Sequence, residues 1–101
     1  DNKLIVMSVS LEICQKELIK LLKSYKLPTK IIVRTDFAFK IDFCNGKYRL
    51  RVWSLKGKSY HLDLFENDVS GIYKLRKTII LNSIDDILER FENWLIDLML
   101  W

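Results

Sequence analysis

Few residues in this sequence could bind a structural metal or form a covalent cross-link. Cysteine occurs twice and histidine once among 101 residues. Cys14 and Cys44 lack the spacing of a metal site, and no second pair of cysteines accompanies them. We expect two reduced thiols, as in a cytosolic or nuclear protein, and no bound metal; the sequence leaves open a disulfide between the two residues.

Long apolar runs are also absent. No segment resembles a signal peptide, and none is long and apolar enough for a transmembrane helix. Hydrophobic residues make up 50% of the sequence and charged residues 30%, which is typical of a globular chain. We expect one intracellular domain over residues 1–101, in the cytoplasm or nucleus, with a modest single core. Because the first residue is Asp1 rather than methionine, we also expect that the chain has been processed or trimmed.

The sequence lacks a catalytic signature. It has no phosphate-binding loop, no metal-ligand spacing and no dinucleotide-binding fingerprint. A lone histidine in a sheet, such as His61, is more typical of a surface residue than of a catalytic base. Cys44 has no neighbouring base that would activate its thiol, and the aspartates of the strand region have arginine neighbours that favour their charged form. We therefore expect no enzymatic activity and no cofactor.

The most regular pattern that is present lies in residues 31–43, IIVRTDFAFKIDF. Apolar residues occupy one parity of this run, and charged residues occupy the other. A period of two held over the run predicts one long β-strand with an apolar face and a charged face. A helix would need apolar residues every three or four positions, which this run does not supply.

The turn that follows this strand sets a register. Asn45–Gly46 between alternating runs is typical of a type I′ hairpin turn. It predicts a second strand over 48–54 in which Asp42 faces Arg49 and Lys40 faces Arg51. The second pairing places two cations side by side, which is unfavourable. An anionic ligand at this row would explain it, and so would neutralisation by carboxylates of the neighbouring rows; the sequence leaves both open.

A second turn contains Gly57. We expect a three-residue loop over 55–57, because a two-residue loop would break the alternation of the strands that it joins. This loop places Val52 opposite Tyr60 in a third strand, and it places Arg51 beside His61.

Helices are expected at both ends of the chain. The first helix runs over about 10–25 with Ser10 as its N-cap, and residues 1–9 form a short strand or an apolar lead-in. The last helix is capped by Asn82 or Ser83.

A fourth strand is expected over about 72–81. Tyr73 and Leu75 lie on its apolar parity, and Lys77 interrupts that parity, which predicts a bulge or an edge strand. The whole pattern predicts an α+β fold: an N-terminal helix, a four-stranded antiparallel β-meander, and a C-terminal helix packed on the apolar face of the sheet.

The C-terminal segment 94–101 is apolar nearly all round. One sheet cannot cover every side of such a helix, so we expect a second surface to cover the rest. A homodimer is the simplest arrangement. The residues that we predict at its interface are Trp94, Leu95, Leu98 and Trp101.

Positive charge is concentrated in the strand region. Residues 30–77 carry eleven basic and five acidic groups, whereas residues 78–101 carry one basic and five acidic groups. A basic sheet suggests a polyanionic partner. Single-stranded nucleic acid needs cations for its backbone and flat side chains for its bases. The residues that we predict to bind it are Lys40, Lys47, Arg49, Arg51, Trp53, Lys56, Lys58, Arg76 and Lys77.

Residues 40–95 resemble a known family through a few short stretches, which are residues 46–49, 56–58, 62–64 and 76–82. In their order and spacing this part of the chain resembles the positive cofactor four family of transcriptional coactivators, which bind single-stranded DNA. The resemblance implies four antiparallel strands, a following helix that forms a dimer, and contacts to the nucleic-acid backbone. The residues that match the family's backbone contacts are Lys47, Arg49, Lys56, Lys58, Arg76 and Lys77.

We therefore expect a non-catalytic binder of single-stranded DNA or RNA that acts as a dimer in transcription or replication. Trp53 would stack on bases; alternatively, the N-terminal segment or a partner chain shields it. The alternative function is a protein–protein interaction module, such as an inhibitor or regulatory subunit, that uses the apolar C-terminal helix.

Overall fold

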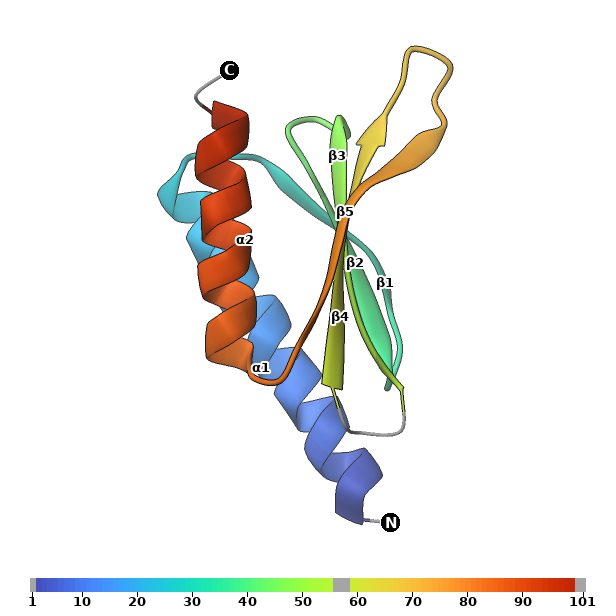
Figure 1. Cartoon of the computed structure of the whole chain (residues 1–101), viewed down its shortest axis with the longest axis vertical. Helices are drawn as coiled ribbons and strands as arrows, with labels where there is room; N and C mark the ends of the chain where they lie inside the picture. Colours follow the sequence, from blue (N-terminus) through green and yellow to red (C-terminus); the bar gives the residue numbers. More distant parts are fainter. Residues whose placement is uncertain (1, 56–58, 100–101) are drawn as a thin grey trace.

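The computed structural model describes residues 2–55 and 59–99, and in it two helices enclose five strands along the chain (Figure 1). The elements are α1 (Asn2–Ser24), β1 (Thr29–Arg34), β2 (Ala38–Phe43), β3 (Tyr48–Leu55), β4 (Ser59–Asn67), β5 (Tyr73–Leu81) and α2 (Ile84–Met99). The strands form one antiparallel sheet in the order β1-β2-β3-β4-β5. Both helices lie on one face of this sheet, which we call the covered face, and the opposite face is the open face. The predicted α+β class, with a helix at each end of an antiparallel meander, is confirmed.

The sheet has five strands rather than the predicted four, because residues 31–43 are not one strand. They divide into β1 and the paired β2, with a turn at Thr35. The Thr35 hydroxyl oxygen accepts hydrogen bonds from the backbone N–H groups of Phe37 (3.2 Å) and Ala38 (3.1 Å). A threonine hydroxyl that satisfies backbone donors in this way favours a turn over an extended chain. Alternation cannot reveal such a turn, since the same period continues on both sides of it.

Helix α1 begins at Asn2, so Ser10 lies inside the helix and is not its N-cap. The residues before Ser10 contain no proline or glycine that would end a helix. The predicted end near residue 25 is confirmed. Lys26 adopts a left-handed conformation (φ 58°), and the N–H of Leu27 donates to the carbonyl oxygen of Leu22 (3.1 Å). This hydrogen bond satisfies one of the last carbonyl groups of the helix, just before Pro28.

The register of the first hairpin is as predicted. Asp42 pairs with Arg49, and Lys40 pairs with Arg51. Asn45–Gly46 supplies the two positive φ angles, 56° and 86°, that a type I′ turn requires.

The predicted register of the second hairpin is wrong by two residues. Val52 pairs with Leu62 rather than with Tyr60, and Arg51 pairs with Asp63 rather than with His61. Since Leu55 pairs with Ser59, the connection comprises 56–58, which lie outside the described residues. A shift of two residues keeps every side chain on its face and changes only its neighbours. It gives Arg51 an acidic partner, which offsets the like-charge contact with Lys40.

Strand β5 contains the predicted irregularity, displaced by one residue. The pairing of Leu64 with Lys77 is followed by that of Phe65 with Leu75, so Arg76 is the extra residue of a bulge. Strand β5 is also an edge strand of the sheet. The bulge reverses the faces of the residues before it. Leu75 and Tyr73 therefore lie on the open face, not on the covered face as predicted.

The core fills the space between the covered face and the two helices. Among the residues whose burial the structure describes, sixteen buried hydrophobic residues contribute to it: Leu11, Cys14, Leu18, Leu22, Phe39, Ile41, Phe43, Leu50, Val52, Tyr60, Leu62, Leu64, Ile87, Phe91, Trp94 and Leu95. The ring of Phe91 on α2 meets that of Phe43 on β2 edge to face, with centroids 5.6 Å apart. Full burial of each large side chain contributes about 1.5–3 kcal/mol. Within the described residues, no helix combines the length and apolarity needed to cross a membrane.

Candidate nucleic-acid interface

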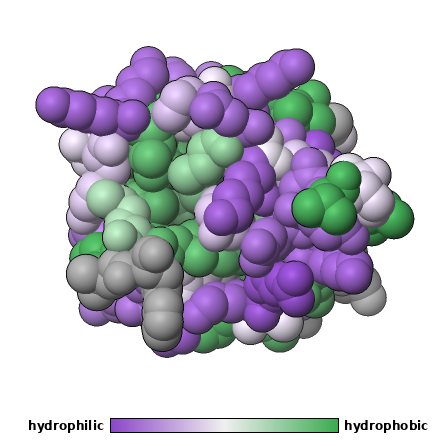
Figure 2. Space-filling view, turned by 90° about the horizontal axis from the view of Figure 1, so that it is seen from above, coloured by the Kyte–Doolittle hydropathy of each residue, from purple (hydrophilic) through white to green (hydrophobic). Residues whose placement is uncertain are grey.

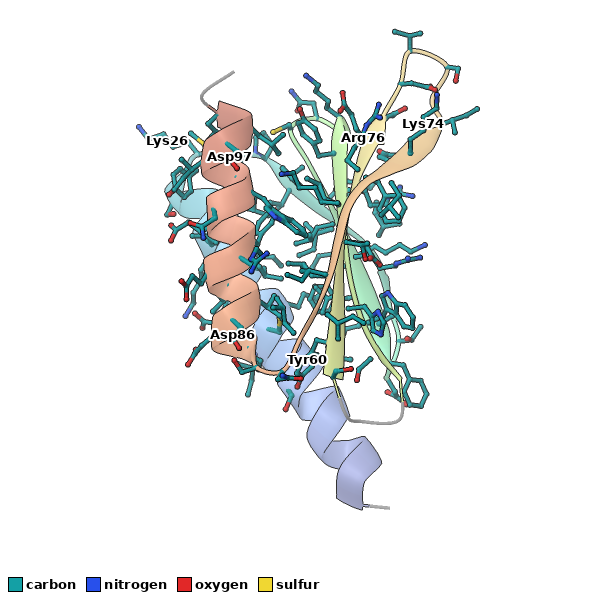
Figure 3. The ribbon with its side chains drawn as sticks, viewed as in Figure 1. Lys26, Tyr60, Lys74, Arg76, Asp86 and Asp97 are labelled. Carbon is teal, nitrogen blue, oxygen red and sulfur yellow. The ribbon has the colours of Figure 1, made fainter. Side chains whose placement is uncertain are left out.

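The open face carries charged and aromatic side chains in rows that run across the strands. Residues that pair directly across antiparallel strands lie on the same face of the sheet. From the strand pairing, one row contains Trp53, His61 and Ile80, the next contains Lys40, Arg51, Asp63 and Thr78, and the third contains Asp42, Arg49, Phe65 and Leu75. Figure 3 shows side chains projecting from this face on the side away from the helices. Among the described residues, no helix covers these rows.

Arg49 is held by a carboxylate and an aromatic ring. Its Nε donates to Asp42 Oδ1 (2.6 Å), and its Nη2 donates to Asp42 Oδ2 (3.0 Å). The guanidinium lies 4.0 Å from the ring centroid of Tyr73. The Tyr73 hydroxyl donates to the carbonyl oxygen of Gly46 (2.6 Å), which holds the ring in place. The hydrogen bonds with Asp42 raise the pKa of Arg49, so the group is a permanent cation.

Asp63 is the centre of a second network. Its carboxylate accepts hydrogen bonds from Arg51 Nε (2.9 Å), Trp53 Nε1 (2.8 Å) and Thr78 Oγ1 (2.5 Å). Burial raises the pKa of Asp63, but the hydrogen bonds from these three donors outweigh burial and hold the pKa below its usual value. Asp63 is therefore charged at neutral pH and fixes the orientation of Trp53 and Arg51.

Aromatic rings alternate with these guanidinium groups. The ring of Trp53 stacks on that of His61, with centroids 4.0 Å apart and an interplanar angle of 19°. The Arg51 guanidinium lies 5.6 Å from the Trp53 centroid and 5.1 Å from that of Phe65. Contacts of this kind contribute about 0.5–1 kcal/mol at exposed sites. The rings of Trp53 and Tyr73 and the two guanidinium groups of the open face are thus held in place by their neighbours.

A hollow of about 130 Å³ opens between the second and third rows. It is lined by Lys40, Arg49, Arg51, Phe65 and Tyr73. Three of these side chains are cations, and two of the cations are ion-paired with the adjacent carboxylates. Among the described residues, Lys40 is the cation of this group that has no ion pair.

The structure brings together four of the nine predicted nucleic-acid-binding residues on the open face. These four are Lys40, Arg49, Arg51 and Trp53. Because the described residues of α1 lie on the covered face, they do not shield Trp53.

The other five predicted residues lie elsewhere. Lys47 is in the first hairpin turn, with its ammonium 5.3 Å from the ring centroid of Tyr48. Arg76 at the bulge is ion-paired with Glu66 (3.4 Å). The ammonium of Lys77 lies 5.9 Å from the ring centroid of Trp94, so this side chain points to the covered face. Lys56 and Lys58 lie outside the described residues.

Sequence reasoning missed two aromatic residues of this face, Phe65 and Tyr73. The parity of Phe65, next to the buried Leu64, could have placed it there. Tyr73 could not be placed by parity, because the bulge at Arg76 reverses its face.

Two of the four residues predicted at a dimer interface are buried within one chain. Trp94 and Leu95 belong to the core, and Leu98 is partly buried against it. Trp101 lies outside the described residues. Seen from above, apolar surface gathers between α2 and the sheet (Figure 2). Helix α1 packs beside α2, and the Tyr25 hydroxyl donates to Glu92 Oε2 (2.9 Å). Part of the second surface expected for this helix is therefore α1, and the homodimer stays a prediction.

The two thiols are free and do not form a disulfide with each other. Burial raises the pKa of Cys14 to about 12. Burial also raises the pKa of Cys44 at the hairpin turn, against the opposing effect of Lys47. Raised pKa values disfavour the thiolate, which is the reactive form. In residues 2–55 and 59–99, no group of three or more His, Cys, Asp or Glu side chains is placed to hold a metal ion.

Comparisons with models of protein families, with curated proteins and with solved structures found no match to this chain. The resemblance to the positive cofactor four family therefore stays an expectation from the sequence. The geometry of the open face is the main basis for inferring a function.

Proposed function

We propose that the protein binds single-stranded nucleic acid, DNA or RNA, on the open face of the sheet and catalyses no reaction. The observation that carries this proposal is the alternation of aromatic rings with guanidinium groups on a face that no described helix covers. Proteins that bind single strands combine cations, which attract the backbone, with rings on which bases stack.

The fixed positions of the rings support the proposal energetically. Trp53 is oriented by its hydrogen bond to Asp63 and by its stack on His61. A side chain that is already ordered loses little conformational entropy when a ligand binds. Stacking of a base on an aromatic side chain contributes about 1–3 kcal/mol. Bases paired in a duplex are not free to stack on a protein ring, so single strands are the favoured ligand.

The resemblance adds two elements to the proposal. By analogy with the positive cofactor four family, the protein would act as a homodimer and would serve transcription or replication inside the cell. These elements depend on the sequence motifs alone, whereas the binding face depends on the geometry described above.

Titration of fluorescein-labelled oligonucleotides, followed by anisotropy at low salt, tests the proposal. We expect single-stranded oligo-dT or oligo-rU to bind more tightly than a duplex of equal length. Lys40→Ala should weaken binding, and Lys16→Ala on the exposed surface of α1 is the matched control. Absence of measurable binding at low salt would overturn the proposal, because backbone contacts strengthen as salt is lowered.

Tryptophan fluorescence offers a second readout of the same proposal. We expect single strands to quench the fluorescence of Trp53, and Trp53→Phe should remove this change. If the variant is quenched as strongly as the original protein, the ligand does not contact Trp53.

A protein–protein interaction module is the second candidate function. It is favoured by the exposed apolar side chains Ile96 (41% exposed) and Met99 (51% exposed) on α2. Replacing both by lysine should abolish capture of a protein partner while the circular dichroism spectrum is unchanged. Trp94 is unsuitable for this test, because it is buried and its replacement by a charged residue would disrupt the core.

A further inference from the structure

We infer that the centre of the open face contacts the bases of the bound strand, while the phosphates lie toward the rim of the sheet or toward solvent. This inference rests on the proposed function and specifies its ligand as a strand with unpaired bases, rather than any flexible polyanion. The juxtaposition of charges and rings around the hollow supports it.

The charge at the centre of the face is nearly balanced. The hollow contains three cations, Lys40, Arg49 and Arg51. The carboxylates of Asp42 and Asp63 lie beside them, so the net charge of these five side chains is about +1 at neutral pH. The ion pairs are short: Arg49 Nε lies 2.6 Å from Asp42 Oδ1, and Arg51 Nη2 lies 2.8 Å from Asp63 Oδ2. A phosphate placed in the hollow would be attracted mainly by Lys40, because each of the two guanidinium groups has a carboxylate next to it that offsets its charge.

The rings around the hollow fit a flat ligand. Phe65 and Tyr73 line the hollow, and the stacked pair Trp53–His61 lies in the row beyond. Each arginine has five N–H donors, of which the carboxylates use only part. The remaining donors can pair with acceptors on the edge of a base. Guanidinium planes themselves also stack on bases.

The rim of the sheet, by which we mean the cations Lys74 and Arg76 and their acidic partners, has more exposed ion pairs than the centre. Lys74 is paired with Asp68 over 3.7 Å, and Arg76 with Glu66 over 3.4 Å; their cationic side chains are 59% and 50% exposed. Both lie on β5 towards the β4–β5 loop (Figure 3). Exposed pairs contribute little to stability, about 0–1 kcal/mol. These cations can therefore exchange their partners for phosphates at smaller cost than the central arginines, whose partner carboxylates are buried.

A comparison of normal and abasic oligomers tests the inference. Oligo-dT and a deoxyribose-phosphate oligomer of equal length, which lacks bases, are titrated by anisotropy over a range of salt concentrations. We expect oligo-dT to bind at least about tenfold more tightly, the equivalent of one stacked base. We also expect a slope of log K against log salt no steeper than about −1.4, the value for two phosphates.

The outcomes separate this inference from the proposed function. Equal affinity for the two oligomers, or a slope steeper than about −1.4, would overturn the base-contact inference and leave a polyanion-binding face. Binding of neither oligomer would overturn both proposals together.

Variants that remove a carboxylate test whether the weak attraction for phosphates arises from the ion pairs of the open face. Asp63→Asn and Asp42→Asn each release an arginine from its carboxylate, so each should raise the affinity for the abasic oligomer and steepen its salt dependence by about one phosphate. Asp97→Asn is the matched control, since it makes the same change of net charge on α2, whose packing side is the covered face (Figure 3). Two central positions are used in case one variant unfolds, as judged by circular dichroism. An equal gain with the control would mean that net charge alone acts, and the inference would fail.

Discussion

The covered face and the open face of this sheet are built from the same strands but are stabilised differently. The covered face consists of apolar side chains, and the free energy that their burial contributes is non-directional. An apolar side chain can therefore exchange one apolar neighbour for another and stay buried. The open face depends on directional bonds from Arg49, Arg51 and Trp53 to particular carboxylates. The difference explains why the two-residue error in the second hairpin leaves the core unchanged and alters the chemistry of the open face.

The largest expected effect concerns the covered face. Phe91→Ala should lower the free energy of unfolding by about 3–5 kcal/mol, because it leaves a cavity against Phe43. Urea denaturation measures this change. Phe37→Ala is the matched control: Phe37 is 50% exposed, and we expect a change within about 0.5 kcal/mol. Equal losses in the two variants would contradict the assignment of Phe91 to the core.

The next effect concerns the open face. Asp63→Ala removes the shared acceptor of Arg51, Trp53 and Thr78, and we expect a loss of about 1–3 kcal/mol in the free energy of unfolding. Asp97→Ala, at an exposed position of α2, should change it by no more than about 0.5 kcal/mol. A loss for Asp63→Ala as small as that of the control would show that the polar network stabilises nothing.

The pH dependence of stability should also reflect the open face. The folded protein holds the pKa of Asp63 below its usual value, so the unfolded chain binds this proton more readily. The stabilisation is therefore present above about pH 4, the ordinary aspartate range, and is lost as the pH falls through the lower folded-state pKa. Asp68, whose hydrogen bond from Ser70 contributes most to a pKa of about 2, acts in the same direction.

Melting temperatures between pH 7 and pH 2 measure this dependence. Asp63→Asn should reduce the loss of melting temperature on acidification, whereas Asp97→Asn, which removes an exposed carboxyl of α2, should leave it unchanged. An identical pH profile for Asp63→Asn and the original protein would contradict the stated role of Asp63.

The smallest expected effect concerns the turn that divides β1 from β2. Thr35→Val removes the hydroxyl acceptor of two backbone N–H groups, and we expect a loss of about 0.5–1.5 kcal/mol. Thr35→Ser keeps the hydroxyl and is the control. Hydrogen exchange of the Phe37 and Ala38 amides should increase in the valine variant only; unchanged exchange would show that the turn does not need the hydroxyl.

Local signals predicted much of the fold. Asn45–Gly46 was sufficient for the first hairpin, because few residue pairs accept two positive φ angles. Pro28 was sufficient to predict the end of the first helix, because proline lacks the backbone N–H that the interior of a helix requires. The second hairpin could not be predicted, because Gly57 fits either of two three-residue loops, 55–57 or 56–58. These give strand registers that differ by two residues, and both registers keep the alternation. Its register depends instead on the tertiary contacts of Arg51 and Trp53 with Asp63.

The candidate site was only partly predictable for related reasons. Lys40, Arg49, Arg51 and Trp53 share a parity with Asp42 across a hairpin whose turn was clear. Arg76 and Lys77 were also predicted to lie with them, but the position of the bulge in β5 decides which way each side chain points. That position is a property of the pairing between β5 and β4, and the sequence of β5 alone does not contain this information.

The sequence by itself determined the alternation of apolar and charged residues, the first hairpin turn and the end of the first helix, because each depends on neighbours a few residues apart. The tertiary structure decided the division of residues 31–43 into two strands, the pairing of Arg51 with Asp63, and the turning of Tyr73 to the open face. These features depend on contacts between strands, where a shift of one or two residues exchanges one set of partners for another.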